Sequence, residues 1–466
     1  MFVGRHDELA SLERLYETPG FQMAVLYGRR RVGKTSLMAE FCRDKKHIFY
    51  VAIEQNDKGA LRSFSEKVLE AFPAARGYLD GFQSWDTAFR YVADQSGQER
   101  IILVIDEYPY LASGNPSISS ILQRSIDTEM LKGNLFLMLC GSSMSFMENQ
   151  VLGYKSPLYG RRSAQVRVEP FDYLDSSLFF PNYSPEEKVL AYGVAGGIPQ
   201  YLGYITREGS LREGIIRSFL DPTGALYEEP SSLLKQELRE PALYNSMIAA
   251  IASGASRLND IALRVGEDTN KTAKYLKTLV DLRIVERELP YGEESQRKGL
   301  YSVADNMFRF WYRFVQDNVS SIESGMGEAV FDKRILPDVS NYLGSVFEDI
   351  CMQYVLRRNK AQTLPIWING IGRWWGNNPI MKRQEEIDLV APSDKAAVFG
   401  ECKWRNEPTG REVLSDLTER SKLLGRYEDR HYMIFSKSGF TTGLKAEALE
   451  RDDVELVELR ELFLQP

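Results

Sequence analysis

One nine-residue segment constrains the fold of this chain more than any other. A short apolar run, Met23–Tyr27, leads into a segment that matches the pattern GxxxxGK[ST], and a helix-prone stretch follows. In this pattern the glycines let the backbone curl so that N–H groups point at a phosphate, and the helix N-terminus adds its dipole. The sequence therefore predicts a strand, a phosphate-binding loop and a helix. The loop and helix start consist of Gly28, Arg29, Arg30, Arg31, Val32, Gly33, Lys34, Thr35 and Ser36.

Within this loop, Lys34 is expected to reach the β- and γ-phosphates, and Thr35 is expected to hold Mg²⁺. Further polar residues follow two later apolar runs. Asp106 and Glu107 end the first, where Asp106 can anchor the magnesium ion through water and Glu107 can polarise the attacking water. Ser142 follows the second, in the place of a polar sensor of the γ-phosphate, although an ordinary serine-rich turn is the alternative.

Five short apolar runs occur in the first 180 residues, and the connections between them are long enough for helices. Such spacing requires crossover connections and predicts a parallel sheet. The runs are Met23–Tyr27, Ile48–Val51, Ile101–Ile105, Leu135–Leu139 and Val166–Val168. We therefore expect an α/β multidomain protein. Its predicted parts are a P-loop core at 1–180, a helical lid at 181–238, a winged helix at 239–315, a linker at 316–336 and a second α/β domain at 337–466.

Several motifs together resemble the archaeal-type P-loop ATPases of the AAA+/STAND group. They are Phe2–Arg5 with Glu8 and Leu9, Tyr27–Thr35, Ile105–Glu107, Gly141–Ser143, Ser156–Arg161 and Gly196–Leu202. The resemblance implies that the nucleotide is ATP, with Val3, Gly4 and Arg5 near the base. It also implies that Pro199, in the Gly197–Pro199 turn, sits on a lid over the nucleotide. Arg161 or Arg162 looks like the cation that meets the phosphates from a lid or a neighbouring subunit, with a solvated surface role as the alternative.

Residues 241–305 have the pattern of a winged helix. Helices are expected at Leu243–Ser253, Leu258–Val265 and Asn270–Leu282, followed by two strands. On the third helix Lys271, Lys274 and Lys277 lie away from the apolar stripe, so this helix could enter a DNA groove. Because the region holds nine Lys and Arg against nine Asp and Glu, it lacks the positive field of a strong DNA binder, and a protein contact is the alternative.

The C-terminal region predicts two neighbouring strands that carry acids. Glu385–Ala391 contains Asp388, and Ala396–Trp404 contains Glu401 and Lys403, two residues apart and therefore on one face. A hairpin turn between these strands can bring the three side chains together. Two carboxylates and a lysine at one point can bind a divalent metal and activate water against a phosphodiester. An upstream helix, expected at Tyr342–Arg357, adds Glu348 as a further candidate metal ligand.

Asp388 followed by Glu401-Cys402-Lys403 resembles the signature of PD-(D/E)xK nucleases, and the expected order of helix, three strands, helix and strand is that of the restriction-endonuclease-like fold. The proline that usually precedes the first acid is replaced by Ile387. This resemblance implies a magnesium-dependent nuclease-like domain. Archaeal-type ATPases of the group often carry such a domain.

The whole sequence then predicts an ATPase coupled to DNA binding and to a nuclease-like domain. The rivals are a nucleotide-gated switch that binds DNA or protein without cutting, and a chaperone-like remodelling ATPase. The four cysteines lack metal-like spacing, and no apolar run reaches the roughly 18 residues of a membrane span, so a cytoplasmic protein without a membrane partner is expected. The net charge of −7 argues against a nucleic-acid coat protein, and a homo-oligomer stays open.

Overall fold

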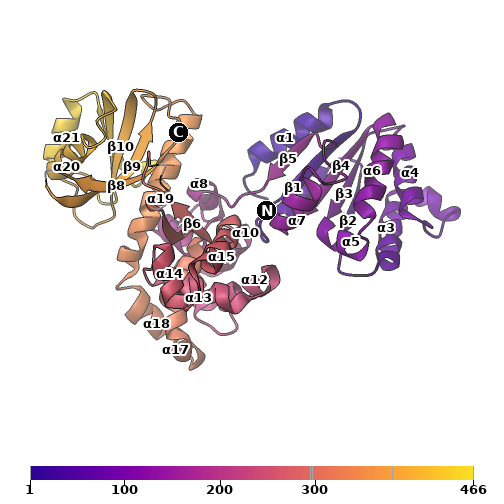
Figure 1. Ribbon diagram of the computed structural model, residues 1–466, viewed down its shortest axis with the longest axis horizontal. Coiled ribbons are helices and arrows are strands. Elements are labelled where there is room, and N and C mark those ends of the chain that lie inside the picture. Colours follow the sequence, from indigo (N-terminus) through magenta and orange to yellow (C-terminus); the bar gives the residue numbers. More distant parts are fainter. Residues whose placement is uncertain (1, 294, 296–297, 380, 465–466) are drawn as a thin grey trace. The chain divides into compact units, whose positions relative to one another are not determined.

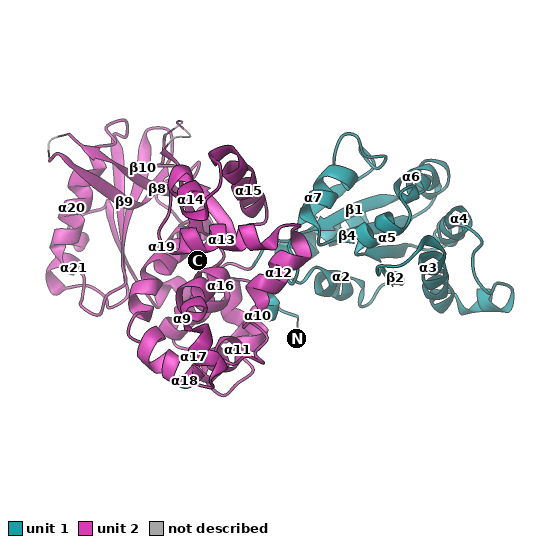
Figure 2. Ribbon diagram, turned by 60° about the horizontal axis from the view of Figure 1, so that its bottom comes forward, with its two compact units in different colours: residues 1–170, 198–200 teal, residues 171–197, 201–466 magenta. Residues whose placement is uncertain are grey.

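The protein is described by a computed structural model covering residues 2–293, 295, 298–379 and 381–464 (Figure 1). It divides into two compact units, coloured separately in Figure 2. Unit 1 holds the chain up to Pro170 together with Ile198–Gln200, and unit 2 holds Phe171–Gly197 with the rest of the chain from Tyr201.

Unit 1 is built on a five-stranded sheet in which every pairing is parallel, as the spacing of the apolar runs predicts. The strand order is β2-β3-β4-β1-β5 (Figure 1). The strands are β1 (Gln22–Tyr27), β2 (His47–Val51), β3 (Ile101–Asp106), β4 (Leu135–Gly141) and β5 (Ala164–Arg167). In a parallel sheet the carboxyl ends of the strands share one edge, so the segments after β1, β3 and β4 meet there. The fifth strand ends at Arg167, one residue before the expected end.

Helices cover both faces of this sheet. On one face Tyr16 and Phe41 pack edge-on with Phe136 of β4. On the other face Phe64 and Trp85 belong to the largest apolar cluster of the unit. The helices are α1 (His6–Glu17), α2 (Lys34–Cys42), α3 (Asp57–Ala71), α4 (Trp85–Gln95), α5 (Tyr108–Gly114) and α6 (Ile118–Thr128). Buried on both faces, the strands need the nearly continuous apolar runs that the sequence contains.

Unit 2 begins with helices and continues into a three-helix segment with a two-stranded antiparallel hairpin. The first set is α8 (Tyr173–Ser176), α9 (Pro185–Ala195), α10 (Pro199–Ile205, whose first two residues belong to unit 1), α11 (Leu211–Phe219) and α12 (Glu229–Glu237). The second set is α13 (Pro241–Ala252), α14 (Leu258–Val265), α15 (Thr269–Asp281), β6 (Val285–Glu288) and β7 (Leu300–Val303).

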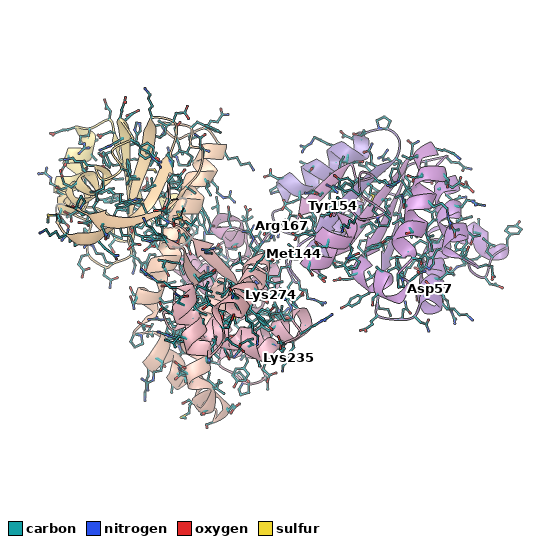
Figure 3. All side chains as sticks on the ribbon, viewed as in Figure 1. Asp57, Met144, Tyr154, Arg167, Lys235 and Lys274 are labelled. Carbon is teal, nitrogen blue, oxygen red and sulfur yellow. The ribbon has the colours of Figure 1, made fainter. Side chains whose placement is uncertain are left out.

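Helix α15 has the two faces that its sequence predicts. Leu276 and Leu279 are fully buried, whereas the α15 lysines are exposed. The α15 lysines are Lys271, Lys274 and Lys277, of which Lys274 is labelled in Figure 3. The outward direction of these three lysines is thereby confirmed.

The segment 316–336, expected to be a linker, is instead folded into unit 2. It contains α17 (Val319–Glu323), α18 (Gly327–Val330) and further short helical turns, following α16 (Asn306–Phe310). Ile322 and Ile335 are buried, and a Cβ on Gly327 would lie 2.1 Å from the carbonyl oxygen of Leu220. Because glycine has no Cβ, it permits this close backbone packing. The segment is therefore packed into unit 2, and the linker prediction is wrong.

The C-terminal part of unit 2 is a mixed five-stranded sheet with the order β12-β11-β10-β9-β8. The β8–β9 and β9–β10 pairs are antiparallel, and β10–β11 and β11–β12 are parallel. The long helix α19 packs against β9 and β10. The elements are α19 (Val339–Lys360), β8 (Gly372–Asn378), β9 (Arg383–Pro392), β10 (Ala396–Lys403), α20 (Arg411–Ser421), β11 (Asp429–Ser436), α21 (Thr442–Leu449) and β12 (Val454–Glu458).

Candidate nucleotide site and carboxylate site

The loop between β1 and α2 curls at the carboxyl edge of the unit 1 sheet. A Cβ on Gly28 would lie 2.3 Å from the carbonyl oxygen of Val168, so no larger residue fits there. Gly33 has φ +90°, which suits glycine. Lys34 is buried, and its Nζ donates to the carbonyl oxygens of Gly28 at 2.8 Å and Arg29 at 3.0 Å. The lysine therefore lies inside the curled loop, while Thr35 and Ser36 are exposed at the start of α2.

The predicted acids and hydroxyls meet beside this loop. Thr35 Oγ1 donates to Asp106 Oδ2 at 2.7 Å, and Ser142 Oγ donates to Glu107 Oε2 at 2.9 Å. Glu107 adopts φ +51°, a left-handed conformation that costs a non-glycine residue about 1 kcal/mol or more. Such strain persists where the surroundings over-determine it, typically at functional sites. The two acids lie at the end of β3, and the serine follows β4. Together with Thr35 at the start of α2, they therefore meet at one edge of the sheet.

The N-terminal motif also supports the loop. Arg5 is buried, and its Nη2 donates to the carbonyl oxygen of Val32 at 2.9 Å while Nη1 pairs with Glu8 at 3.0 Å. Gly4 is buried and Val3 is partly buried in the same segment. Arg5 thereby links the start of the chain to the phosphate-binding loop.

Of the three arginines of the loop, Arg29 is buried, and Arg30 and Arg31 are partly buried. Arg30 Nη2 donates to the hydroxyl of Tyr110 at 3.1 Å. Arg31 has φ +70°, a conformation that non-glycine residues seldom adopt. Both side chains are therefore partly shielded from solvent at the loop.

Pro199 also lies at the loop. A Cβ built on Gly33 would be 3.7 Å from Pro199 Cγ, and Ile198–Gln200 belongs to unit 1 although its flanking residues do not. A Cβ on Gly197 would lie 1.7 Å from the carbonyl oxygen of Phe171, so the turn before Pro199 requires a glycine.

Arg161 lies away from the phosphate-binding loop of its own chain, so a phosphate contact made from a neighbouring subunit stays a prediction. Its Nε and Nη2 bind Asp127 at 2.8 Å and 2.6 Å, at the end of α6. Arg161 precedes β5, at the edge formed by the amino ends of the strands, since Ser163 N donates to Met23 O at the start of β1. The phosphate-binding loop follows the opposite end of β1. Arg162 binds the carbonyl oxygen of Leu152 and also precedes β5.

In unit 2 the predicted carboxylates come together across β9 and β10. The antiparallel register pairs Leu389 with Gly400, so Asp388 and Glu401 follow as neighbours. The amide N–H of Cys402 donates to Asp388 Oδ2 at 2.8 Å. Burial, then repulsion from Glu401 and from Glu348, raise the pKa of Asp388 to about 7. A carboxyl group has a raised pKa when it is buried away from water and lies close to other negative charges.

Glu401 is almost fully buried, and its two oxygens have different surroundings. Oε1 receives Lys403 Nζ at 2.6 Å and pairs with Arg420 Nη2 at 3.2 Å. Oε2 is buried and, among the residues that the structure describes, has no hydrogen-bond partner. An orphaned carboxylate oxygen is costly unless a cation completes it, so this oxygen fits a divalent cation shared with Asp388.

Glu348 takes a different partner from the one expected. Its Oε2 receives Arg373 Nε at 3.1 Å, and among the described residues no three His, Cys, Asp or Glu side chains are arranged to hold a metal. Burial raises the pKa of Glu348, and Arg373 counteracts this. Glu348 was expected to be a metal ligand. In this arrangement its carboxylate is instead paired with an arginine.

Arg373 and Arg420 were missed by the sequence reasoning. Each lies on an element separate from the motif strands, on β8 and α20. Neither belongs to a local pattern, so only tertiary contacts identify them. In the nucleotide site, by contrast, Thr35 and Asp106 supply the hydroxyl and carboxylate oxygens that Mg²⁺ prefers.

None of the helices in the described part of the chain combines the length and the apolar character that a membrane span requires. The phosphate-binding loop, the parallel sheet and the paired acids define a P-loop ATPase unit. Residues 2–205 match a family described as an ATPase domain predominantly from Archaea, and residues 311–419 match one described as archaeal and bacterial proteins of unknown function.

An uncharacterized protein of Methanocaldococcus jannaschii is 33% identical over 476 residues, covering 99% of this chain and 100% of that protein. The chain belongs to the family of this protein. An uncharacterized ATP-binding protein of the same archaeon is 50% identical over 46 residues, 10% of this chain and 78% of its own length. In fold, the chain is similar to a Walker-type ATPase of Pyrococcus abyssi, with 22% identity, a TM-score of 0.51, and coverage of 67% of this chain and 96% of that one.

Proposed function

We propose that this protein hydrolyses ATP and that its nucleotide state controls a C-terminal site that cleaves phosphodiester bonds in nucleic acid. The observation that carries the proposal is the meeting of Asp388, Glu401 and Lys403 on neighbouring strands, with Glu401 Oε2 unpartnered. The ATPase half is supported by the loop, the paired acids and the family.

For ATP, the loop N–H groups and Lys34 would hold the phosphates, and Thr35 and Asp106 would hold Mg²⁺. A bound magnesium ion supplies charge neutralisation for phosphoryl transfer. Glu107 would orient and polarise the attacking water, and its hydrogen bond from Ser142 keeps the carboxylate in place. Lys34→Ala should abolish ATP binding, whereas Glu107→Gln should bind ATP and hydrolyse it poorly. Unchanged hydrolysis in both folded variants would reject the assignment.

At the carboxylate site, Asp388 and Glu401 would hold a divalent cation, which supplies Lewis-acid chemistry for phosphodiester hydrolysis. Lys403, fixed on Glu401, would orient the attacking water or neutralise charge on the phosphorane. The water oxygen forms the new P–O bond, the bond to the leaving sugar oxygen breaks, and that oxygen takes up a proton.

DNA would be recognised by the segment from α13 to β7, which we propose is a winged helix. Its support is the order of three helices and an antiparallel hairpin, with the α15 lysines exposed. Because Lys271 pairs with Glu267 at 2.9 Å, part of this charge is already compensated, so weak, salt-sensitive binding is expected. Arg161 is proposed to serve only at a neighbouring subunit, if the protein assembles.

The deciding experiment is cleavage of plasmid and single-stranded DNA with Mg²⁺ or Mn²⁺, with and without ATP. Asp388→Ala should abolish cleavage, and Lys34→Ala should remove its ATP dependence. Cleavage that survives Asp388→Ala belongs to a contaminant.

A nucleotide-gated switch that binds without cutting is the second candidate. The observation favouring it is that Glu348 is paired with Arg373. Among the described residues, this leaves Asp388 and Glu401 as the two carboxylates of the site. DNA binding that depends on ATP, without cleavage under any metal condition, would select this function.

A further inference from the structure

Arg373 of β8 forms ion pairs with acids from two other segments of unit 2. Its Nε binds Glu348 at 3.1 Å and its Nη2 binds Asp349 at 2.7 Å, both on α19. Its Nη1 binds Glu288 of the β6–β7 hairpin at 3.2 Å. The backbone takes part as well, because Tyr291 N donates to Arg373 O at 2.8 Å. Only 13% of the Arg373 side chain is exposed, so water screens these pairs weakly.

One of these acids faces the carboxylate site. Glu348 lies one helical turn before Cys351, and residues three apart share a helix face. Cys351 hydrogen-bonds through its side chain with Cys402 of β10, whose amide N–H binds Asp388. Phe347, beside Glu348, packs on Trp404 with ring centroids 5.2 Å apart. The face of α19 that carries Glu348 therefore packs on the strand that carries Glu401.

We propose that Arg373 is a positioning residue that withholds Glu348 from the cation site formed by Asp388 and Glu401, and that its release lets Glu348 become the third ligand. The inference rests on the proposed function, since it needs that cation site. The planar guanidinium carries its donors in a rigid fork, so it holds the three carboxylates in a fixed geometry that a flexible lysine ammonium does not impose. While Glu348 is paired in this way, the site has two carboxylates and binds a divalent cation weakly.

The contact between the β6–β7 hairpin and Arg373 offers a way to regulate the cation site. Glu288 belongs to β6, which follows the helix that carries the α15 lysines, and it shares one guanidinium with Glu348. A movement of the hairpin changes the partners of Arg373 and thereby the availability of Glu348. The proposed nucleic-acid contact and the cation site are linked through a single side chain.

The test is a double-mutant cycle on Mn²⁺ affinity, measured by electron paramagnetic resonance on the full, nucleotide-free chain. We expect Arg373→Gln to tighten Mn²⁺ binding about tenfold, the size of effects seen for groups next to metal ligands. Glu348→Gln alone should change the affinity less than about threefold, but in the Arg373→Gln background it should reverse the gain.

Glu288→Gln in the same background is the matched control, because it removes an equal negative charge from the same group of acids without removing a proposed ligand. It should leave most of the gain in place. If Arg373→Gln does not fold, Arg373→Lys replaces it, with a smaller gain of about threefold, since the ammonium forms a single point contact.

Three results would overturn the inference. Mn²⁺ binding by the Arg373→Gln/Glu348→Gln protein as tight as that of Arg373→Gln excludes Glu348 as a ligand. A tenfold loss for Glu348→Gln alone shows that Arg373 does not withhold it. Binding that persists unchanged in Asp388→Ala rejects the cation site itself, and with it the cleavage half of the proposed function.

Discussion

The repulsion between Asp388 and Glu401 makes a quantitative prediction for stability. Burial and the neighbouring carboxylates raise the pKa of Asp388 from 3.8 to about 7. A raised carboxyl pKa means that the folded protein binds the proton more tightly than the unfolded chain. Stability therefore falls as the pH rises from about 4 to about 7 and is level above that range.

Asp388→Asn removes this titration. One pKa unit corresponds to about 1.4 kcal/mol, so the shift of about three units has an upper limit of about 4 kcal/mol above pH 7. The amide oxygen can still accept from the N–H of Cys402, and its NH₂ group can donate to the unpartnered Oε2 of Glu401. We expect the variant to be more stable than the wild type by about 2 kcal/mol at about pH 8, and the difference to vanish near pH 4.

The assay is urea denaturation in a chelator at several pH values, followed by tryptophan fluorescence. Five of the six tryptophans lie in unit 2, with only Trp85 in unit 1, so the signal follows the relevant unit. Asp394→Asn, in the exposed turn between β9 and β10, is the matched control and should show no such pH dependence. Mn²⁺ at about pH 8 should stabilise the wild type and not Asp388→Asn. A stability difference that does not change with pH would show that folding does not raise the pKa of Asp388, and the cation site would lose its electrostatic basis.

Four further changes test the nucleotide unit and the helix α15. Gly28→Ala should abolish ATP binding in an equilibrium titration, because its Cβ would collide with the carbonyl of Val168, and tight binding by a folded variant would contradict the loop geometry. Ser142→Ala should keep ATP affinity but lower turnover about tenfold, since Glu107 loses its hydrogen bond; a change in affinity alone would argue against this role. Arg161→Ala should leave ATP affinity unchanged and cost at most about 1 kcal/mol of stability, because its partner lies at the far edge of the sheet. Replacing the α15 lysines by alanine should weaken DNA binding alike for all sequences and reduce the salt slope by about three, and an unchanged slope would remove the groove-binding hypothesis.

Residues whose roles depend on local backbone geometry were predictable from the sequence. The loop from Gly28 to Thr35 requires glycines at fixed spacing, and the acids after β3 follow from the strand that precedes them. The meeting of Asp388 and Glu401 was predictable because a short hairpin fixes the register of its two strands. In each case the residues that form the pattern and the residues that it positions are close together in the sequence.

The contacts that the sequence did not reveal are those of residues whose partners are distant in the chain. Arg161 lies in a motif that suggests a phosphate contact, yet its place at the amino ends of the strands is set by β5 joining the sheet beside β1. Glu348 has the right helix and the right face, but Arg373 arrives from β8 and takes its carboxylate. Long-range ion pairs leave no periodic signal in a sequence, so neither partner could be identified from spacing.

The two sites have opposite electrostatic requirements, since one is built to bind an anion and the other to bind a cation. Each therefore needs its own set of charged neighbours. The phosphate-binding loop offers backbone N–H groups, Lys34 and three arginines, so an anion stabilises it. The carboxylate site places acids beside acids, so only cations relieve it, and Arg373, Lys403 and Arg420 supply part of that relief from the protein itself. Those internal cations hold the carboxylates in place without a bound metal, but each one that pairs with an acid also competes with the metal. In the proposed mechanism, breaking the single ion pair between Arg373 and Glu348 switches such a site, because it frees the carboxylate that becomes the third ligand.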